Sequence, residues 1–358
     1  MTERGRCDAA NVTDLTGRRV VVRHRVGDKQ TDAVGELSVD GADLVVQTRR
    51  GPVRVARSAV TAVRAIPPAP ARRASLTAIA RLEELCADAW PAFVDERLGA
   101  WRLRTTGGFT ARANSALAIG DPGLPTAVAL AAVRTFAERH GITPRVQAPV
   151  GSPWDKAVAA QGWVLDVGHA AGSVVSVQVA DLGKLAVGPA ADGTAASGAA
   201  GSPVADGTAV EVGEHTGEAA TIEVGERTGE AATIEVGAPT DAWWRLVLGG
   251  LPTPAQRHVL GGAGALTLTD AQGVVGAGRV VVVADHLHVS VLTVDPALRR
   301  RGHGTALLAA AARWGRGHGA RWGVLQVAVH NTAALALYAR AGWTEHHRYR
   351  YLVPSGPQ

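Results

Sequence analysis

The sequence contains little lysine, cysteine and aromatic residue. Its 358 residues include 37 Lys and Arg, but the only lysines are Lys29, Lys156 and Lys184. Guanidinium groups, which suit bidentate contacts with phosphate and carboxylate, therefore carry almost all of the positive charge. The formal net charge of +5 permits acidic partners. It is too diffuse to indicate nucleic-acid binding.

The two cysteines also exclude several classes of protein. Cys7 and Cys86 lie far apart without metal-ligand spacing, so the sequence predicts neither a disulfide framework nor a metal site. The N-terminal "MTERGRCDAANVTDL" lacks the apolar core of a signal peptide. No run of about 18 uncharged apolar residues follows, so we expect a soluble cytoplasmic protein with no membrane span.

The positions of the aromatic residues divide the chain. All of them lie after Ala89, and none lies between Gly183 and Ala242. Residues 12–67 alternate β-rich runs with turn signals, which predicts a small all-β barrel of the SH3-like type. Such barrels often bind peptides or single-stranded nucleic acid on aromatic side chains, and this one has none. We therefore favour a structural or docking role for it.

Two longer segments predict a mixed α+β fold. Residues 72–182 show helical periodicity, then two strands around the turn at Gly107 and Gly108, then further helix and strand. Residues 241–354 predict a helix, three strands joined by tight turns, and an alternation of helix and strand to the end. The expected fold class is α+β, a mixed sheet flanked by helices.

A segment of different composition separates these two parts. In residues 183–240 the sequence "EVGEHTGEAATI" at Glu211 recurs as "EVGERTGEAATI" at Glu223, a period of 12 residues. Two such repeats cannot bury a core, so we interpret the segment as a disordered, low-complexity linker. An acidic interaction module or a single solenoid-like turn stays open.

The stretch "VDPALRRRGHGTALLAAAARWG", from Val294 to Gly315, predicts a strand end, a glycine-rich loop and a helix. The first amides of a helix have no partner within the helix and attract anions, so this arrangement is typical of a phosphate site. A dinucleotide fold would require GxGxxG, but in this sequence Leu307 and Leu308 fill the place of the third glycine. A P-loop would require GK[ST], which is missing.

Two motifs carry a resemblance to a known family. Arg299 to Gly304, "RRRGHG", resembles motif A (R/Q-x-x-G-x-G/A) of the GCN5-related N-acetyltransferases, or GNAT enzymes. Val329 to Trp343, "VHNTAALALYARAGW", resembles motif B of the same family. The resemblance implies two GNAT-like halves, with the acetyl-CoA site in residues 241–354 and a degenerate half in residues 72–182.

The resemblance also implies roles for individual residues. Tyr338 would donate a proton to the leaving thiolate, since a phenol with a reference pKa near 10 stays protonated at neutral pH. A strand amide near Val294 would stabilise the oxyanion, and Asn331 would face the pantetheine arm. The acetyl-CoA contacts that the resemblance implies are Leu292, Thr293 and Val294 for pantetheine and Arg299, Arg300, Arg301, Gly302, His303, Gly304 and Thr305 for the pyrophosphate.

The general base is not evident from the sequence. Members of the family often carry a Glu on the strands before motif A, and "VVVADHLHVSVLTV" has none. His288 is a candidate base or proton relay because it shares strand parity with Ser290 and Leu292. Asp285 and His286 could instead form the turn between two strands, and water could serve as the base. A structural role for His288 also stays open.

The first half offers candidates for the acceptor side. "WRLRTTGGFTARANSALA" resembles a signature of actinobacterial multidomain members with an SH3-like N-terminal barrel and tandem GNAT halves. Arg112, Asn114 and Ser115 are the candidate substrate contacts, and a turn network that fixes two strands is the alternative role for all three. Some members that this layout resembles are described as histone or protein acetyltransferases, and others as N-acetylglutamate synthases.

The resemblance therefore predicts an N-acetyltransferase that moves an acetyl group from acetyl-CoA to a primary amine by direct attack. The acceptor could be a small molecule or a protein, and the oligomeric state is not predicted. A catalytically weak acyl-CoA-binding or protein-docking module is the main alternative. Nucleic-acid binding through the barrel and the arginines is a second alternative that the composition does not favour.

Overall fold

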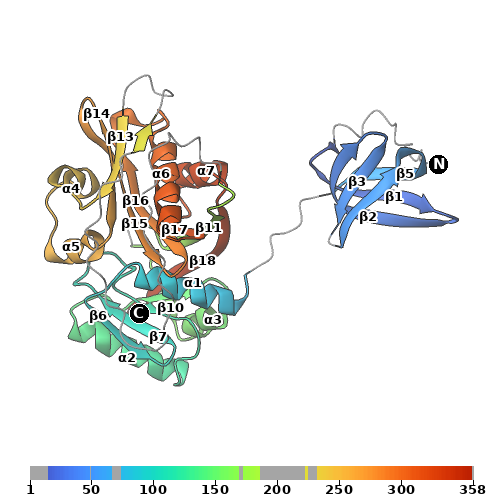
Figure 1. Cartoon of the computed structure of the whole chain (residues 1–358). Coiled ribbons are helices and arrows are strands. Elements are labelled where there is room, and N and C mark those ends of the chain that lie inside the picture. The colour runs from blue at the N-terminus through green and yellow to red at the C-terminus, as the bar shows by residue number, and fades with distance from the viewer. Residues whose placement is uncertain are drawn as a thin grey trace, which may run out of the picture. The chain divides into compact units, whose positions relative to one another are not determined.

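The chain forms two compact units, Met1–Arg72 and Arg73–Gln358. The computed structural model describes residues 15–48, 50–66, 74–168, 172–185, 222–224 and 232–356, with the backbone alone at 222–224. The units are described separately below (Figure 1).

The first unit is a five-stranded antiparallel sheet in the order β4-β3-β2-β1-β5. Apolar residues alternate along its strands, so one face gathers Val20, Val22, Leu37, Leu44 and Val46 into a core. Its elements are β1 (Arg19–Val26), β2 (Lys29–Asp40), β3 (Asp43–Thr48), β4 (Gly51–Ala56), η3 (Arg57–Ala59) and β5 (Val60–Ala65).

The sequence predicts a closed SH3-like barrel for this region. Strands β4 and β5 are the two edges of the sheet and are not paired with each other within the described residues. The all-β composition of the unit is as expected, but closure into a barrel is not confirmed. Short antiparallel strands with tight turns give the same sequence pattern in an open sheet and in a barrel.

The second unit is one continuous mixed sheet with helices on both faces, which confirms the predicted α+β class. The strand order is β12-β13-β14-β15-β16-β17-β11-β18-β9-β8-β7-β6, and β10 pairs with β18. Its elements in chain order are α1 (Leu76–Asp88), β6 (Val94–Leu98), β7 (Trp101–Thr105), β8 (Ala116–Leu117), α2 (Thr126–Arg139), β9 (Val146–Pro149), α3 (Pro153–Ala160), β10 (Trp163–Leu165), β11 (Val174–Asp181), β12 (Ile222–Val224), β13 (Ala232–Gly237), α4 (Asp241–Leu248), α5 (Pro254–Gly261), β14 (Gly264–Asp270), β15 (Gly273–Val283), β16 (His286–Val294), η4 (Pro296–Leu298), α6 (His303–Gly317), β17 (Trp322–Ala328), α7 (Thr332–Arg340) and β18 (Thr344–Pro354).

Two strands of this unit, β11 and β18, each pair with strands of the other half. Strand β11 belongs to the first half in sequence, yet it pairs with β17 and β18 of the second half. Strand β18 pairs with β11 through Thr344 to Arg350 and then with β9 of the first half through Tyr349 to Leu352. Neither half completes its sheet from its own sequence segment.

The expected linker is partly structured. Residues 186–221 and 225–231 lie outside the described residues. Strand β13 at the end of that range is ordered in the sheet, where it pairs with β14 and buries Ala232, Ile234 and Val236. Strand β12 contains the last residue of the first repeat copy, Ile222, and the first two residues of the second copy, and it pairs with the end of the second copy, Ala232 to Ile234. The repeat therefore supplies edge strands, because its Ala-x-Ile-x-Val alternation suits a half-buried strand.

The sheet of the second half separates two helical layers. Helices α6 and α7 pack on the face that carries Leu266, Leu287 and Leu325. Helices α1, α4 and α5 pack on the opposite face, whose residues have the other strand parity, such as Ala265 and Val324. We call this second side the α1 face.

Candidate functional site

The loop between β16 and α6 has the backbone geometry of an anion site. Gly302 is the N-cap of α6 with φ of 90°, and no side chain caps the helix. Arg300 also has positive φ, 68°, so the chain turns sharply before His303. The first amides of α6 consequently lack a side-chain cap and point the positive end of the helix dipole outward.

The three arginines of this loop are exposed. Arg299 Nε donates a hydrogen bond to the Val294 carbonyl oxygen at 3.2 Å, which ties the loop to the end of β16. His303 is buried, and its Nδ1 has no hydrogen-bond partner within the described residues. Gly304 and Thr305 complete the first turn of α6.

Strands β16 and β17 part beside this loop. They run parallel and pair from His286 opposite Trp322 to Val289 opposite Leu325, and no further. Opposite β15, Val291 and Leu292 form a bulge against Gly278, and Val291 has φ of 47°. A bulge leaves its extra residue outside the regular ladder. The segment from Ser290 to Val294, which includes the predicted Leu292, Thr293 and Val294, therefore borders an opening between two parallel strands.

Helix α7 brings Tyr338 to this region. Tyr338 is 8% exposed, and burial raises its pKa to about 12. The helices α6 and α7 approach closely at Gly304, where a Cβ would lie 3.2 Å from Leu337 Cδ2. Tyr338 follows Leu337 in α7, so it belongs to the helix that packs on the first turn of α6.

Asn331 has a structural role in this arrangement. Its Oδ1 accepts a hydrogen bond from the Ala334 amide at 3.1 Å, so the side chain is the N-cap of α7. The Oδ1 atom is thus committed to the helix, while the Nδ2 donor is not part of the cap. The predicted contact with pantetheine could use only that donor.

A group of buried polar side chains lies on the α1 face where β16 and β17 part. Ser290 and Gln326 are the first residues beyond the last paired positions of the two strands. Arg279 lies opposite Ser290 on β15, and His288 precedes Ser290 by two residues, so all four side chains share one face of the sheet. Trp90 covers the group from the first half, with its ring centroid 5.2 Å from Arg279 Cζ and 6.5 Å from the His288 ring.

His288 is uncharged in this environment. Burial, together with the positive charges of Arg112 and Arg279, holds the pKa of His288 well below its ordinary value of 6.5. Its exposed fraction is 1%, and neither ring nitrogen has a hydrogen-bond partner among the described residues. A neutral imidazole with free nitrogens can contact a ligand, but a low pKa makes it a weak proton acceptor.

The alternatives to His288 lie at the far end of the strand. Asp285 lies in the turn between β15 and β16 and His286 begins β16, where the His286 ring Nδ1 is 2.7 Å from Asp285 Oδ1. The backbone oxygen of Asp285 accepts hydrogen bonds from the amides of Arg321 and Trp322. Four or more residues of strand, roughly 13 Å, separate this turn from the bulge, so neither side chain reaches it.

Of the three predicted acceptor contacts, two serve the first half itself. Asn114 Oδ1 accepts from the amides of Thr106 and Gly108 and from the Thr105 hydroxyl, and its Nδ2 donates to two backbone oxygens. This uses the full capacity of an amide, so Asn114 has the turn-network role and no group left for a substrate.

Ser115 is buried and accepts a hydrogen bond from Arg104 Nη2 at 3.3 Å. It belongs to a network inside the first half, because Arg104 also donates to Gln147. Arg112 differs from both, since its guanidinium lies 4.6 Å from the centroid of the Trp90 ring, which also contacts Arg279. Arg112 is therefore the predicted acceptor contact that the structure brings to the parting strands.

Sequence reasoning missed Trp90, Arg279, Ser290 and Gln326. Arg279 had a signal, because it is the only charged residue in the apolar run "GVVGAGRVVVV" of β15. A charged side chain in such a run is either buried with the strand or lies on a strand at the edge of the sheet. The other three give no local signal, since their proximity depends on how β17 and the first half pack against β16.

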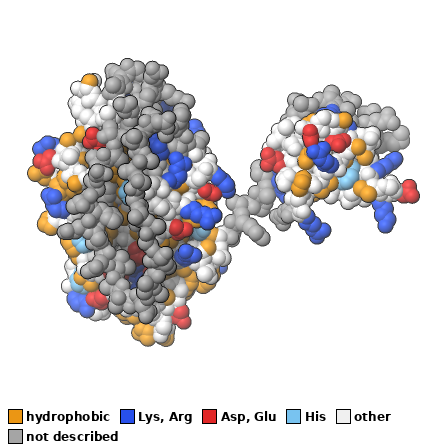
Figure 2. Space-filling model, viewed as in Figure 1, with side chains coloured by type: hydrophobic (Ala, Val, Ile, Leu, Met, Phe, Trp, Pro, Cys, Tyr) orange, Lys and Arg blue, Asp and Glu red, His pale blue; other side chains and the backbone are white. Residues whose placement is uncertain are grey.

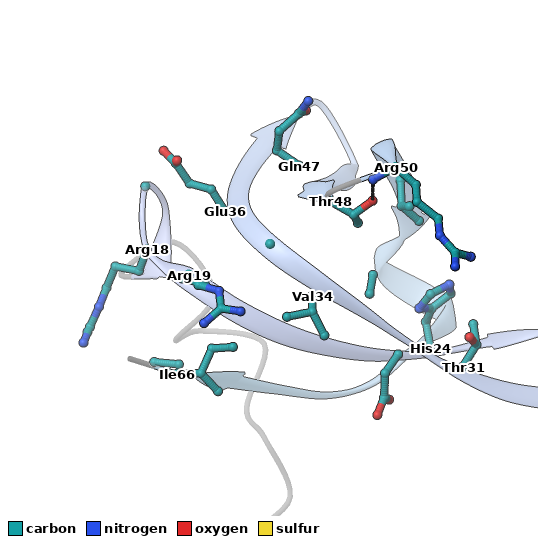
Figure 3. A pocket seen from close by; sticks show the side chains of 16 residues that line it. Arg18, Arg19, His24, Thr31, Val34, Glu36, Gln47, Thr48, Arg50 and Ile66 are labelled. Carbon is teal, nitrogen blue, oxygen red and sulfur yellow. Dashed lines mark hydrogen bonds between the residues drawn. The ribbon is translucent and has the colours of Figure 1, made fainter. Parts of the chain in front are cut away.

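The pocket found in the first unit is unrelated to these residues. It has a volume of about 1440 Å³ and is lined by Arg18, His24, Val34, Glu36 and Thr48 among others (Figure 3). None of its lining residues is aromatic. On the face of the protein seen in Figure 2, Lys and Arg side chains are interspersed with Asp and Glu. Neither feature favours a nucleic-acid site.

The parted parallel strands and the glycine-initiated helix define a protein with the architecture of CoA-dependent acetyltransferases. Residues 76–151 and 206–352 match the family described as "Probable histone acetyltransferase Rv0428c C-terminal". The chain belongs to this family, and the resemblance to GNAT enzymes carried by motifs A and B is confirmed. No protein with a curated description matches the chain.

Solved structures of similar proteins are also titled as GNAT enzymes. A GCN5-related N-acetyltransferase from Kribbella flavida is 15% identical, covers 78% of this chain and 96% of its own, and has a TM-score of 0.49. One from Sphaerobacter thermophilus is 17% identical, with 68% and 74% covered and a TM-score of 0.41. A tandem GNAT protein from the clavulanic acid biosynthesis pathway is 16% identical, with 82% and 90% covered and a TM-score of 0.44.

No helix in the described part of the chain is both long and apolar enough to cross a membrane.

Proposed function

We propose that this protein is an N-acetyltransferase that transfers the acetyl group of acetyl-CoA directly to a primary amine. The observation that carries the proposal is the loop from Arg299 to Gly302, which leads into the uncapped first turn of α6 beside the parting of β16 and β17. Family membership supports the same reaction class. The cytoplasmic location and the docking role of the N-terminal sheet stay predictions.

The donor would bind along this loop and strand. The amides from Arg300 to Thr305 would hold the pyrophosphate, aided by the helix dipole and the exposed guanidinium groups. The backbone from Leu292 to Val294, free of β17, would pair with the pantetheine arm. The Nδ2 group of Asn331 would donate to the same arm.

The reaction forms a C–N bond and breaks the C–S bond of the thioester. The amine attacks the carbonyl carbon, and an amide of the bulge or the strand up to Val294 stabilises the oxyanion. The proton that the amine loses is the one that the leaving thiolate gains. Atoms and charge therefore balance without a further reactant.

The pKa of Tyr338 restricts its part in this proton transfer. Full transfer from a phenol of pKa about 12 to a thiolate with a reference pKa near 8.5 is uphill by about 5 kcal/mol. We propose that Tyr338 donates a hydrogen bond to the sulfur while the intermediate collapses, and relays the proton released by the amine. This role needs the hydroxyl but not a tyrosinate.

The low pKa of His288 also restricts the acceptor amine. Deprotonation at pH 7 costs about 1 kcal/mol for an α-amino group of pKa near 7.8, but about 4.6 kcal/mol for a lysine side chain. A weak base or water suffices for the first and not for the second. We therefore assign His288 to contact or proton relay on the acceptor side rather than to strong base catalysis.

Release of CoA thiol from acetyl-CoA in the presence of amines tests the function. We expect thiol release with at least one class of amine, and a Tyr338→Phe change should lower kcat by about tenfold or more while the KM for acetyl-CoA stays within twofold. Equal losses of turnover and of acetyl-CoA affinity would make Tyr338 a packing residue. Tight acetyl-CoA binding without thiol release across all amine classes would favour the acyl-CoA-binding alternative.

A further inference from the structure

Unpartnered polar atoms are concentrated at one place in the fold. Of the twelve buried side-chain nitrogen and oxygen atoms that lack a hydrogen-bond partner in the described residues, eight lie on the α1 face beside the parting of β16 and β17. They are Arg112 Nε, Arg279 Nε and Nη1, His288 Nδ1 and Nε2, Ser290 Oγ, and Gln326 Nε2 and Oε1. We call these five residues the polar cluster. Buried polar groups are normally paired, so such a concentration marks a place where a partner binds.

The polar cluster carries positive charge without a counterion. Arg279 is 2% exposed, and no carboxylate of the described residues forms an ion pair with Arg279 or Arg112. Burial and then the charge of Arg112 lower the pKa of Arg279 to about 9, which still leaves it protonated at pH 7. Both guanidinium groups lie near the Trp90 ring, with Cζ of Arg112 at 4.6 Å and Cζ of Arg279 at 5.2 Å from its centroid, and the His288 ring centroid is 6.5 Å from it.

Other arginines of the second unit that are buried or partly buried have polar partners. Arg102 contacts Glu84, Asp88 and Asp95, and Arg145 and Arg350 each pair with an aspartate. Arg104 is 1% exposed and has no carboxylate partner, but its Nη2 donates hydrogen bonds to Ser115 and Gln147. Each of these arginines thus has an ion pair or a hydrogen bond, whereas Nε and Nη1 of Arg279 have no partner within the described residues. An isolated buried charge is unfavourable, so the charge on Arg279 is expected to be matched by a ligand that arrives later.

The location of the polar cluster indicates which ligand that is. Ser290 and Gln326 are the first residues beyond the paired part of β16 and β17, so they border the opening where the thioester is proposed to lie. Arg279 is three residues along β15 from Gly276, which pairs with Val294, a distance of roughly 10 Å. The polar cluster is therefore next to the proposed position of the acetyl group and apart from the pyrophosphate loop.

We propose that the acceptor is an amine that also carries a carboxylate, and that Arg279 and Arg112 bind this carboxylate. The inference rests on the proposed N-acetyltransferase function. Guanidinium groups match a carboxylate in charge and in geometry. Ser290, Gln326 and His288 supply donors and acceptors for the rest of a small polar molecule. An amino acid fits this description.

The same charges disfavour a basic acceptor. A lysine side chain within a cationic segment, as in a histone tail, would bring further positive charge to two guanidinium groups that have no carboxylate partner. The weak basicity of His288 agrees, since it suits an α-amino group. The polar cluster thus favours an acceptor different from the histone that the family's description suggests.

Matched pairs of acceptors test the proposal with the full-length protein and acetyl-CoA. Each pair is an amino acid and its amide, which differ only in the carboxylate, and a lysine-rich basic peptide completes the panel. We expect kcat/KM for the acid to exceed that for the amide by at least tenfold. Equal or higher values for the amides or the peptide would overturn the inference while leaving the transferase function intact.

An Arg279→Gln variant tests the assigned residue. We expect its KM for the amino acid to rise at least tenfold, its preference for the acid over the amide to vanish, and its KM for acetyl-CoA to stay unchanged. Arg245→Gln removes an exposed arginine of α4 and is the matched control. Equal losses of kcat for acid and amide in Arg279→Gln would show a structural role and contradict the assignment.

A binding measurement separates the inference from the proposed function. With saturating acetyl-CoA, amino acids should raise the Tm of the protein, their amides should not, and Arg279→Gln should abolish the effect. This result would support a carboxylate site even if no amine released thiol, in which case only the transferase function fails. The proposed carboxylate site would be overturned if inorganic phosphate raised the Tm more than amino acids do at equal ionic strength, or if no amino acid raised it.

Discussion

At the residue scale, the donor site depends on backbone conformations that few residues adopt. Gly302 has φ of 90°, and nothing lies within 4 Å of where its Cβ would be. Glycine is therefore needed at position 302 for its backbone conformation and not for lack of space. Arg300 adopts φ of 68° without being glycine, so the loop already contains one strained position.

A Gly302→Ala substitution should consequently disturb the loop. We expect a loss of about 1–2 kcal/mol in the free energy of unfolding, because a non-glycine residue is strained at this φ. The affinity for acetyl-CoA should fall several-fold as the loop relaxes. Denaturant unfolding and acetyl-CoA titration measure the two effects.

Gly317→Ala is the control, since Gly317 ends the same helix, has no positive φ and has open space around it. This change should be neutral or stabilise by up to about 1 kcal/mol. Identical unfolding free energies and acetyl-CoA affinities for Gly302→Ala and the unaltered protein would show that the loop does not require this conformation.

Tyr338 should leave a signature in alkaline stability. Its pKa is about 12 in the folded protein and near 10 when unfolded, so the folded state disfavours the tyrosinate. The stability that the protonated phenol contributes to the folded state is complete below pH 10 and is lost as the pH rises from 10 to 12. We expect the unaltered protein to lose more stability than Tyr338→Phe across this window, measured by urea unfolding at each pH. Parallel curves would contradict the burial of the hydroxyl.

At the element scale, Asn331 combines two roles that one substitution series can separate. Asn331→Ala should lower the free energy of unfolding by about 1 kcal/mol, because it removes the cap of α7. Asn331→Asp keeps a capping oxygen and should restore stability. It lacks the amide donor, so the KM for acetyl-CoA should stay raised. Restoration of both quantities by aspartate would mean that Asn331 only caps the helix.

Local sequence patterns were sufficient for the elements around the donor loop. The strand, loop and helix of residues 286–317 and the helix that ends before Gly342 follow from alternation, helical spacing and glycine positions. Strands β6 and β9 and helix α5 were not predicted. β6 reads "VDERL", which lacks a run of apolar residues, and β9 is only four residues long.

The candidate site was predictable only where one motif contains it. The donor residues lie in motif A and motif B, so their grouping follows from the family pattern. The polar cluster combines Arg112 from the first half with residues of β15, β16 and β17. Asn114 shows the converse case, since its hydrogen bonds to residues 105–110 are local but depend on a loop shape that the sequence does not reveal.

At the scale of the second unit, the exchange of β11 and β18 is the feature furthest from the sequence. Strands of the two halves pair across more than 160 residues, as Val179 with Thr344. Periodicity identifies both segments as strands but contains no information on their partners. This exchange makes the two halves one folding unit, although the family pattern presents them as a tandem.

The exchange predicts that the halves cannot fold separately. Val175, Val177 and Leu182 of the first half are buried among second-half strands, and each such side chain contributes about 1.5–3 kcal/mol. Their sum, roughly 5–9 kcal/mol, is comparable with the whole stability of a domain. A polypeptide of residues 183–358 should therefore show no cooperative thermal unfolding and no stabilisation by acetyl-CoA.

Co-expression with residues 1–182 should restore both properties, because the break then falls outside every strand while β11 can still insert between β17 and β18. Size-exclusion chromatography should show the two polypeptides eluting together, and circular dichroism should show a single cooperative transition. If residues 183–358 alone unfolded cooperatively at the Tm of the intact chain, the exchanged strands would not be what holds the two halves together.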